Sequence, residues 1–167
     1  FKCDWSSDVC SSDLGWAAED VSHCLLLGDG FVAASRADSA RMHAIADELE
    51  HAQPEDPYWI FSAEMTRVAA MFIGRSVAEA LAKSWELLHT SGRTRSFRIV
   101  RGLLLGLHAD MLTALGEYEE ALAVLDNAVT HPGHAVCFPM QRSRTLLQMG
   151  REREVIDSTN ACVALHD

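Results

Sequence analysis

Two histidines and a cysteine stand close together in the segment His131-Pro-Gly-His134-Ala-Val-Cys137. Imidazole nitrogens and thiolate sulfur are ligands that zinc prefers, and a spacing of three residues would let them reach one ion. A structural zinc site takes four ligands, however, and the sequence indicates no fourth. The alternative is a polar turn between helices, with Cys137 packed at the start of the next helix. We assign no metal site here.

His108 and Asp110 are a second combination with chemical potential. A histidine beside a carboxylate can transfer protons as a general acid or base. Both residues lie in a segment with a helical pattern, where positions two apart do not face each other. We therefore expect His108 to be a hydrogen-bonded histidine between helices rather than a catalytic group.

The segment Leu27-Gly-Asp-Gly30 contains a Gly-x-Gly pattern. Such glycines can begin a nucleotide-binding loop, where the backbone approaches a phosphate closely. Here the pattern follows a helical segment, and it lacks the third glycine and the Lys-Ser/Thr pair of a phosphate loop. We interpret it as a turn or a break in a helix.

Arg93, Arg95, Arg98 and Arg101 form a local basic run. Arg98 and Arg101 are three residues apart, so they could share a helix face that receives an acidic partner or an anion. The alternative is a solvated helix start that nearby carboxylates balance. These patterns together assign no catalytic, cofactor-binding or metal-ligating residue, and we expect no cofactor and no enzyme activity.

The composition indicates a globular protein. The chain has 167 residues, of which 49% are hydrophobic and 23% charged, with a formal net charge of −10. This apolar content is typical of a folded domain. The acidic balance argues against direct binding of nucleic acid or of an anionic membrane. No apolar run approaches the roughly 20 residues that span a bilayer, and we expect a cytoplasmic protein.

The first fourteen residues have no helical or strand periodicity. The stretch from Asp4 to Leu14, DWSSDVCSSDL, resembles the translation of a sequencing-library adapter; the alternative is a native polar N-terminus. We expect residues 1–14 to be a disordered, non-native artefact and residues 15–167 to be one domain of a longer protein. The remaining cysteines are Cys24, Cys137 and Cys162, and an odd number cannot complete a disulfide framework. We expect reduced, packed thiols.

The rest of the sequence predicts one helix after another. Ala, Leu, Glu and Arg dominate, and no segment alternates as a strand would. Asp56 is placed to cap a helix whose first residue is Pro57. Glycine and proline breakers divide the chain into predicted helices over 15–35, 39–52, 57–73, 75–89, 95–115, 117–130, 138–149 and 151–166.

Amphipathic helices alternate with helices that are apolar on most sides. The predicted buried stripes of two amphipathic helices are Met42, Ile45, Ala46, Leu49 and Ala52 in one, and Val77, Leu81, Trp85 and Leu88 in the other. The segments 57–73 and 95–115 carry apolar residues nearly all round, which is typical of a helix between neighbours. The alternation predicts about four antiparallel pairs, each with an inner and an outer helix.

The pairing has a period. Gly116 and Gly150 are 34 residues apart, and small or apolar residues match at the same offset on both sides of them. In earlier units Ala40, Ala80 and Ala121 are predicted to hold equivalent places in successive outer helices. A fixed period between about 20 and 50 residues indicates a stacked array of helix pairs.

The segment from Ala109 to Ala128, ADMLTALGEYEEALAVLDNA, resembles a tetratricopeptide repeat. The family has a small residue in the first helix, Gly-x-Tyr at the turn, and small and large residues in the second helix. These fall on Ala109, Gly116, Tyr118, Ala121, Leu125 and Ala128. Long, degenerate repeats of this kind resemble the repeat region of bacterial transcription regulators of the maltose-regulator (LuxR-associated) type. The resemblance implies an all-α, right-handed α-solenoid of about four antiparallel helix pairs.

The resemblance implies a protein–protein interaction scaffold, or the regulatory repeat region of a bacterial signal-responsive transcription regulator. A protein or peptide partner, or a small inducer, would bind a groove walled by the inner helices. A small-molecule sensor is the alternative, and an uncharacterised enzyme the third. We also expect self-association through exposed repeat ends, because a terminal repeat without a polar cap exposes apolar surface.

Overall fold

The computed structural model describes residues 18–90, 98–129 and 138–157, and within these ranges the chain is all-helical, without strands. Its helices are α2 (Ala18–Ser35), α3 (Ser39–Ala52), α4 (Pro57–Ile73), α5 (Val77–Thr90), α6 (Arg98–Leu115), α7 (Tyr118–Val129) and α8 (Phe138–Gln148). Residues 152–157 are helical as well. The all-α fold class predicted from the sequence is confirmed.

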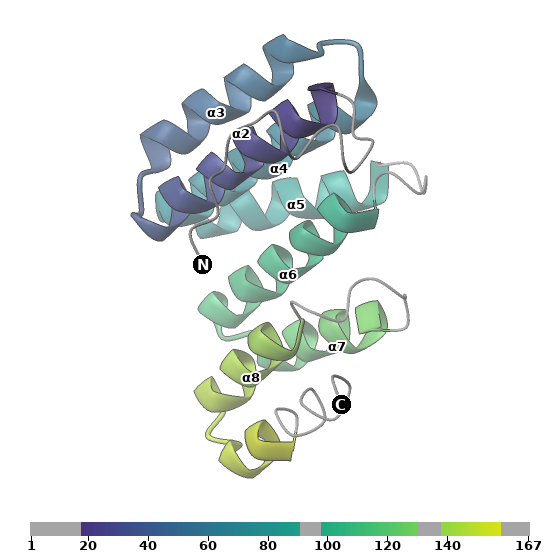
Figure 1. Cartoon of the computed structure of the whole chain (residues 1–167). Helices are drawn as coiled ribbons and strands as arrows, with labels where there is room; N and C mark the ends of the chain where they lie inside the picture. Colours follow the sequence, from purple (N-terminus) through teal and green to yellow (C-terminus); the bar gives the residue numbers. More distant parts are fainter. Residues whose placement is uncertain (1–17, 91–97, 130–137, 158–167) are drawn as a thin grey trace, which may run out of the picture.

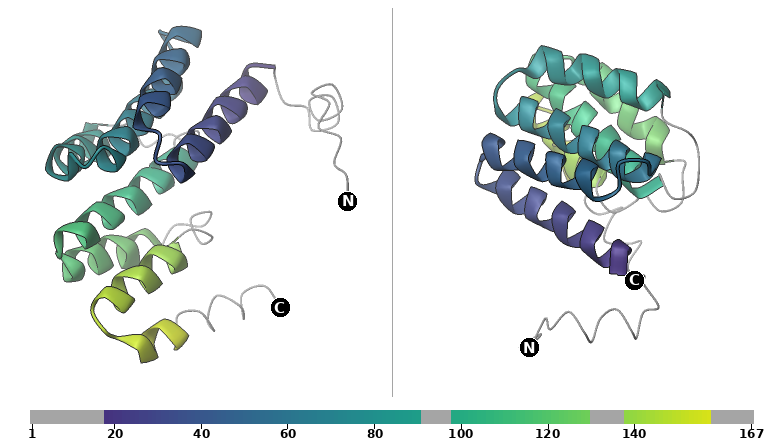
Figure 2. Two further views of the ribbon diagram at one scale, coloured as in Figure 1. Left: turned by 90° about the vertical axis from the view of Figure 1, so that its left-hand side faces the viewer. Right: turned by 90° about the horizontal axis from the view of Figure 1, so that it is seen from above.

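The helices follow one another along an elongated molecule (Figure 1). Each helix packs against its neighbours in the chain, and α2 also contacts α4, α4 contacts α6, and α6 contacts α8. The even-numbered helices therefore form a continuous row that links all units, while α3, α5 and α7 each cover one junction of that row. Two further views show how the helices turn relative to one another along the molecule (Figure 2).

The predicted ends of the first long helices are confirmed. Helices α3 and α4 have the bounds that the sequence predicted, 39–52 and 57–73. The carboxylate of Asp56 accepts a hydrogen bond of 2.8 Å from the backbone N–H of Tyr58, and Pro57 opens the helix. Most of the predicted stripe of α3 is buried, namely Met42, Ile45, Ala46 and Leu49, while Ala52 is exposed.

The prediction of a turn or helix break at Gly28 and Gly30 is wrong. Both residues lie inside α2, which continues to Ser35. Gly30 is buried, and a Cβ there would lie 4.0 Å from Cγ2 of Thr66 on α4. That distance is an ordinary van der Waals contact, so the packing would accept an alanine at this position. Because this segment is helical, no phosphate loop forms there.

The predicted stripe of α5 is wrong at Trp85. Leu88 is buried as predicted, and Val77 and Leu81 pack against the core as partly buried side chains, but Trp85 is 55% exposed. The helix also buries Ala80, Ser84 and Leu87. Ala80 and Ser84 are fully buried, because their small side chains let the backbones of neighbouring helices approach closely. Apolar periodicity misplaced Trp85 because it does not account for this close approach.

Buried polar pairs join neighbouring helices. The hydroxyl of Ser62 on α4 lies 2.8 Å from Nε2 of His23 on α2, and both side chains are buried. On α6 and α8, Thr113 and Thr145 meet through their hydroxyls, also at 2.8 Å. Each of these partners would lose a hydrogen bond inside the protein if the helices slid along each other, so the pairs fix the register of the row.

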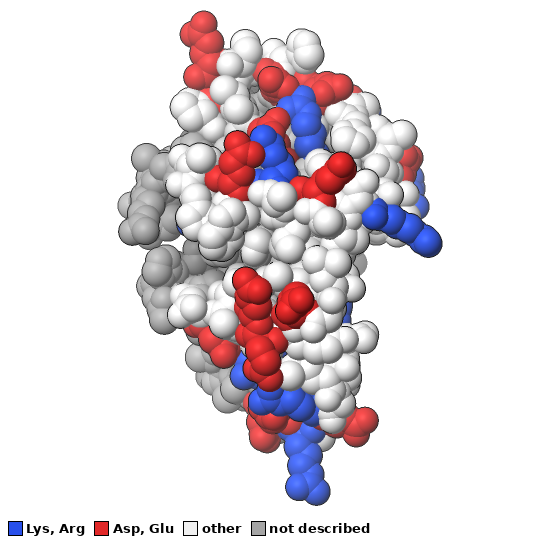
Figure 3. Space-filling model, turned by 180° about the vertical axis from the view of Figure 1, so that it is seen from behind, with Lys and Arg blue, Asp and Glu red and all other residues white. Residues whose placement is uncertain are grey.

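Ion pairs connect α3, α4 and α5 at the surface. The guanidinium of Arg67 binds Asp47 at 2.8 Å and Glu64 at 2.6 Å, and Glu64 also lies 3.4 Å from the ammonium of Lys83. The hydrogen bond from Arg67 lowers the pKa of Asp47. On the face shown in Figure 3, acidic and basic side chains are interspersed and uncharged surface separates their groups. No patch of a single sign dominates that face.

Helices α2, α4, α6 and α8 end in the same turn. The turn contains one residue with a left-handed backbone: Ala37 at φ 55°, Arg75 at 70°, Gly116 at 85° and Gly150 at 71°. The next residue donates its backbone N–H across five residues at 2.9 Å, in the bonds Asp38 to Ala33, Ser76 to Met71, Glu117 to Leu112 and Arg151 to Leu146. This pattern is the Schellman motif, which satisfies the last carbonyls of a helix.

The shared turn gives the register of the units. The residue that follows the left-handed one accepts the first hydrogen bond of the next helix, donated by Met42, Ala80, Ala121 and Val155 in turn. Met42 and not Ala40 is therefore the equivalent of Ala80, and the predicted equivalence of Ala40 is wrong. Ala40 is exposed, whereas Met42 is 3% exposed. A search for matching small residues missed this register, because the first unit has a methionine at the contact.

The turns predict opposite effects for two glycine-to-alanine substitutions. A Cβ added at Gly116 would have no atom within 4 Å, so Gly116→Ala should cost about 1 kcal/mol of unfolding free energy through its left-handed backbone alone. Gly28→Ala, also in open space but inside a helix, should stabilise by about 0.5–1 kcal/mol. Arg75→Gly should stabilise by a similar amount. Urea unfolding followed by circular dichroism measures all three, and a stabilising Gly116→Ala would contradict the assignment.

Candidate functional site

Several residues singled out in the sequence lie outside the described part of the chain. These are His131, His134, Cys137, Arg93 and Arg95, and the side chain of Arg98 is outside it as well. Within the described ranges, no group of three or more His, Cys, Asp or Glu side chains is placed to hold a metal ion. Arg101 is described: its Nη1 donates to the carbonyl of Leu88 at the end of α5, at 2.6 Å.

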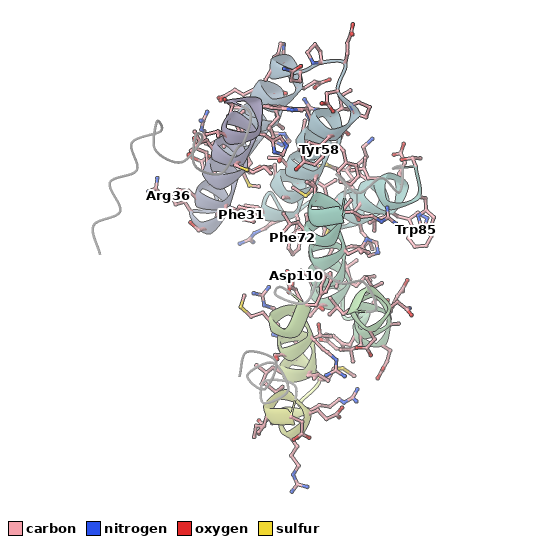
Figure 4. All side chains as sticks on the ribbon, turned by 45° about the vertical axis from the view of Figure 1, so that its right-hand side comes forward. Phe31, Arg36, Tyr58, Phe72, Trp85 and Asp110 are labelled. Carbon is pink, nitrogen blue, oxygen red and sulfur yellow. The ribbon has the colours of Figure 1, made fainter. Side chains whose placement is uncertain are left out.

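His108 and Asp110 point to different partners, as their spacing predicted. His108 is 3% exposed, and its Nδ1 lies 2.7 Å from the hydroxyl of Ser84 on α5. Asp110 accepts a hydrogen bond of 2.9 Å from Arg144 on α8, and it lies on α6 where that helix faces α8 (Figure 4). The expectation of a hydrogen-bonded histidine between helices is confirmed, and the two side chains do not form an acid–base pair.

The hydrogen bonds of Ser84 set the tautomer of His108. The single proton of the Ser84 hydroxyl goes to the carbonyl of Leu81, at 2.8 Å. With the hydroxyl proton on the carbonyl of Leu81, Nδ1 of neutral His108 carries the ring proton and donates it to the serine oxygen; a hydroxyl turned toward Nδ1 would reverse the tautomer. Nε2 is left unprotonated, as a hydrogen-bond acceptor, and it makes no hydrogen bond within the described residues.

The environments of His108 and Asp110 shift both pKa values toward the neutral form. Burial lowers the pKa of His108, and the nearby His89 lowers it further. Burial raises the pKa of Asp110, and the attraction of Arg144 offsets only part of that effect. His108 is therefore neutral at pH 7, with its acceptor nitrogen available.

A cavity of about 260 Å³ opens beside His108, between α5, α6 and α7. Its lining combines Trp85, Leu88 and His89 from α5, Arg101, Leu105 and His108 from α6, and Val124 from α7. The rings of Trp85 and His89 lie against each other, with centroids 3.8 Å apart and planes inclined by 41°. The His108 ring is 6.2 Å from that of Trp85. The cavity thus has an aromatic wall, aliphatic side chains and three nitrogen-bearing groups.

The polar side chains that line the cavity differ in charge. Arg101 supplies a permanent positive charge, and the described lining residues include no Asp or Glu. His89 uses Nδ1 on the carbonyl of Trp85, at 2.8 Å. Arg101 and His108 were both singled out in the sequence, for separate reasons. Their meeting was not predicted, because Trp85 was assigned to the buried face of its helix and His89 was given no role.

A second surface feature is the exposed side of α2. Val21, Cys24, Leu25, Gly28, Phe31 and Val32 lie along it, and we call this set the α2 face. Leu25 is 60% exposed and Phe31 58%, although both are apolar. Asp29 is held 3.7 Å from Arg41 on α3.

Cys24 belongs to the α2 face, and its thiol is exposed. The prediction of a packed thiol is wrong here, because the buried side of α2 is made by His23, Leu26, Leu27 and Gly30 with Ala33. The helix is apolar on both sides, so its sequence could not tell which side would be covered. Cys137 and Cys162 lie outside the described residues.

Comparisons with known proteins found no match: no protein-family model, no curated protein and no solved structure is similar to this chain. Among the helices that the structure describes, none is both long and apolar enough to cross a lipid bilayer. The sites of this chain must therefore be interpreted from their own chemistry.

The lowered pKa of His108 predicts a pH-dependent stability. In the unfolded chain, His108 has a pKa of about 6.5, so it binds a proton more readily than the buried His108 of the folded chain. Stability should therefore fall as the pH drops through about 6.5. His108→Gln should flatten the dependence of unfolding free energy on pH between about 7.5 and 5.5. Equal slopes in the wild type and His108→Gln would contradict the burial argument.

Proposed function

We propose that this chain is a helical-repeat scaffold that binds a protein partner. The proposed arrangement is a right-handed, tetratricopeptide-like α-solenoid of antiparallel helix pairs. The recurring turn at Ala37, Arg75, Gly116 and Gly150 supports it, as do the contacts that link α2, α4, α6 and α8. Stacked helix pairs of this kind present extended surfaces for recognition.

The α2 face is the observation that carries the proposal. An exposed apolar patch without charge is costly in water and marks an interaction site. Its residues recur with helical spacing, which suits a second amphipathic helix laid along α2, and Phe31 offers a central aromatic anchor. The partner we propose is therefore an amphipathic helix of another protein, with apolar residues facing Leu25, Phe31 and Val32.

The resemblance of residues 109–128 to a tetratricopeptide repeat extends the proposal to a biological setting. We place the chain in the repeat region of a cytoplasmic, signal-responsive bacterial transcription regulator. In regulators of that type the ATPase switch and the DNA-binding helices lie outside the repeats. The repeat region would then pass on a signal through the partner that it binds.

Small-molecule sensing is the second candidate function. The cavity between α5, α6 and α7 favours it, because polar groups converge there on an otherwise apolar space. The α2 face and this cavity lie on different helices. Figure 4 shows Phe31 and Trp85 at opposite sides of the view, so the two functions can be tested separately.

Photo-cross-linking tests the docking surface. A photoreactive phenylalanine analogue at position 31 should form adducts with a protein partner in living cells, and the same analogue at Ser22, exposed on α2 beside the face, should form at least tenfold fewer. Leu25→Glu should abolish the adduct at position 31, because a carboxylate buried against an apolar helix loses its hydration. Equal yields at positions 22 and 31 would reject the α2 face as the docking surface.

Self-association is measured with the same variants. Sedimentation velocity should show dimers or larger species in the purified wild type and monomers in Leu25→Glu, since the charge prevents two apolar faces from pairing. Ser22→Glu, a charge of the same sign on the same helix, should associate like the wild type. A wild-type chain that stays monomeric at high concentration would contradict association through this face.

A further inference from the structure

The cavity beside His108 contains complementary groups in one small space. Arg101 provides positive charge, Nε2 of His108 provides an acceptor that no described residue uses, and Trp85 and His89 provide aromatic faces. Leu88, Leu105 and Val124 complete the lining with aliphatic carbon. Each of these groups limits the kinds of ligand that could bind in the cavity.

The geometry points to a binding site for a small aromatic carboxylate that carries a hydroxyl group. In this site the carboxylate pairs with Arg101, the ring lies along Trp85, and the hydroxyl donates to Nε2 of His108. The inference deepens the sensing function proposed above and does not depend on the α2 face.

The carboxylate of the proposed ligand is inferred from the charge of Arg101 and from the absence of Asp and Glu among the described lining residues. A guanidinium offers a planar set of N–H donors that matches a carboxylate. Its Nη1 is held by the carbonyl of Leu88, at 2.6 Å, so the group is oriented before a ligand enters. A cationic ligand would find no Asp or Glu among the lining residues and would be repelled by Arg101.

The aromatic ring of the proposed ligand is inferred from the aromatic side chains that line the cavity and from the cavity volume. A cavity of about 150 Å³ is enough to hold benzene, so 260 Å³ has room for one ring with small substituents. The aliphatic side chains and the exposed indole of Trp85 would gain apolar contact with such a ring. A bare inorganic anion would leave this apolar surface uncovered.

The hydroxyl group of the proposed ligand is inferred from the tautomer of His108. Ser84 holds the proton of the imidazole on Nδ1, so Nε2 can only accept a hydrogen bond. A second carboxylate or a phosphate oxygen would place an acceptor against an acceptor. A hydroxyl group supplies the donor that this nitrogen requires.

The test uses 4-hydroxybenzoate and 3-hydroxybenzoate as probes, measured by calorimetry and by quenching of tryptophan fluorescence. At least one of them should bind saturably to the full chain. Benzoate lacks the hydroxyl and phenol lacks the carboxylate, and each should bind at least tenfold more weakly. Benzoate binding as tightly as both hydroxybenzoates would overturn the role of His108.

Variants separate the site from the fold. Arg101→Gln should weaken binding at least tenfold, Arg101→Lys should weaken it less because the charge is kept, and Arg75→Gln should bind like the wild type. Leu25→Glu should also bind normally, so a failure of the docking proposal would not be mistaken for a failure of this one. Undiminished binding by a folded Arg101→Gln would overturn the site.

Nitrogen NMR of the histidine rings gives a readout that requires no substitution. In the ligand-free chain, His108 should show a protonated Nδ1 and an unprotonated Nε2. Addition of the bound probe should shift the Nε2 signal, as a new hydrogen bond reaches it. A proton on Nε2 in the free chain, or no saturable shift at millimolar probe, would overturn the proposal.

Discussion

The turn that ends α2, α4, α6 and α8 is the constraint on which the rest of the structure depends. One residue must adopt a left-handed backbone, so that the following N–H can reach a carbonyl five residues earlier. That same following residue begins the hydrogen-bond ladder of the next helix. Direction and register of the next helix are thus set within two residues, and this places Ala80 and Ala121 where they are completely buried. The cavity lies in the space that remains between three helices so positioned.

The local features of the fold could be predicted from the sequence. The pair Asp56 and Pro57 marks a helix start by its chemistry alone, and the glycines at 116 and 150 mark turns because only glycine adopts their backbone without strain. Ala37 and Arg75 make the same turn with side chains that disfavour it, so no local signal could reveal them. The repeat was consequently read two residues out of register in the first unit.

Features that depend on how several helices pack together could not be predicted from the sequence. Helix α2 is apolar on both sides, so only its packing on α3 and α4 decides that His23 is buried while Leu25 is exposed. Trp85 points outward because the smaller residues Ala80 and Ser84 make the contact between the helices. Apolar periodicity does not indicate how closely two helices approach. The cavity joins residues from α5, α6 and α7, whereas in the sequence Trp85, Arg101 and His108 were interpreted as parts of separate features.

Among the described helices, the main contacts join helices that are next to each other in the chain or one helix apart. The buried apolar side chains of the described ranges fall into three clusters rather than one shared core, so cohesion is spread over local interfaces. Loss of structure can therefore start at one end and stop at a junction, leaving the remaining units intact. The buried pairs His23–Ser62 and Thr113–Thr145 lie at such junctions. They tie α2 to α4 and α6 to α8, so opening at either junction must first break a buried hydrogen bond.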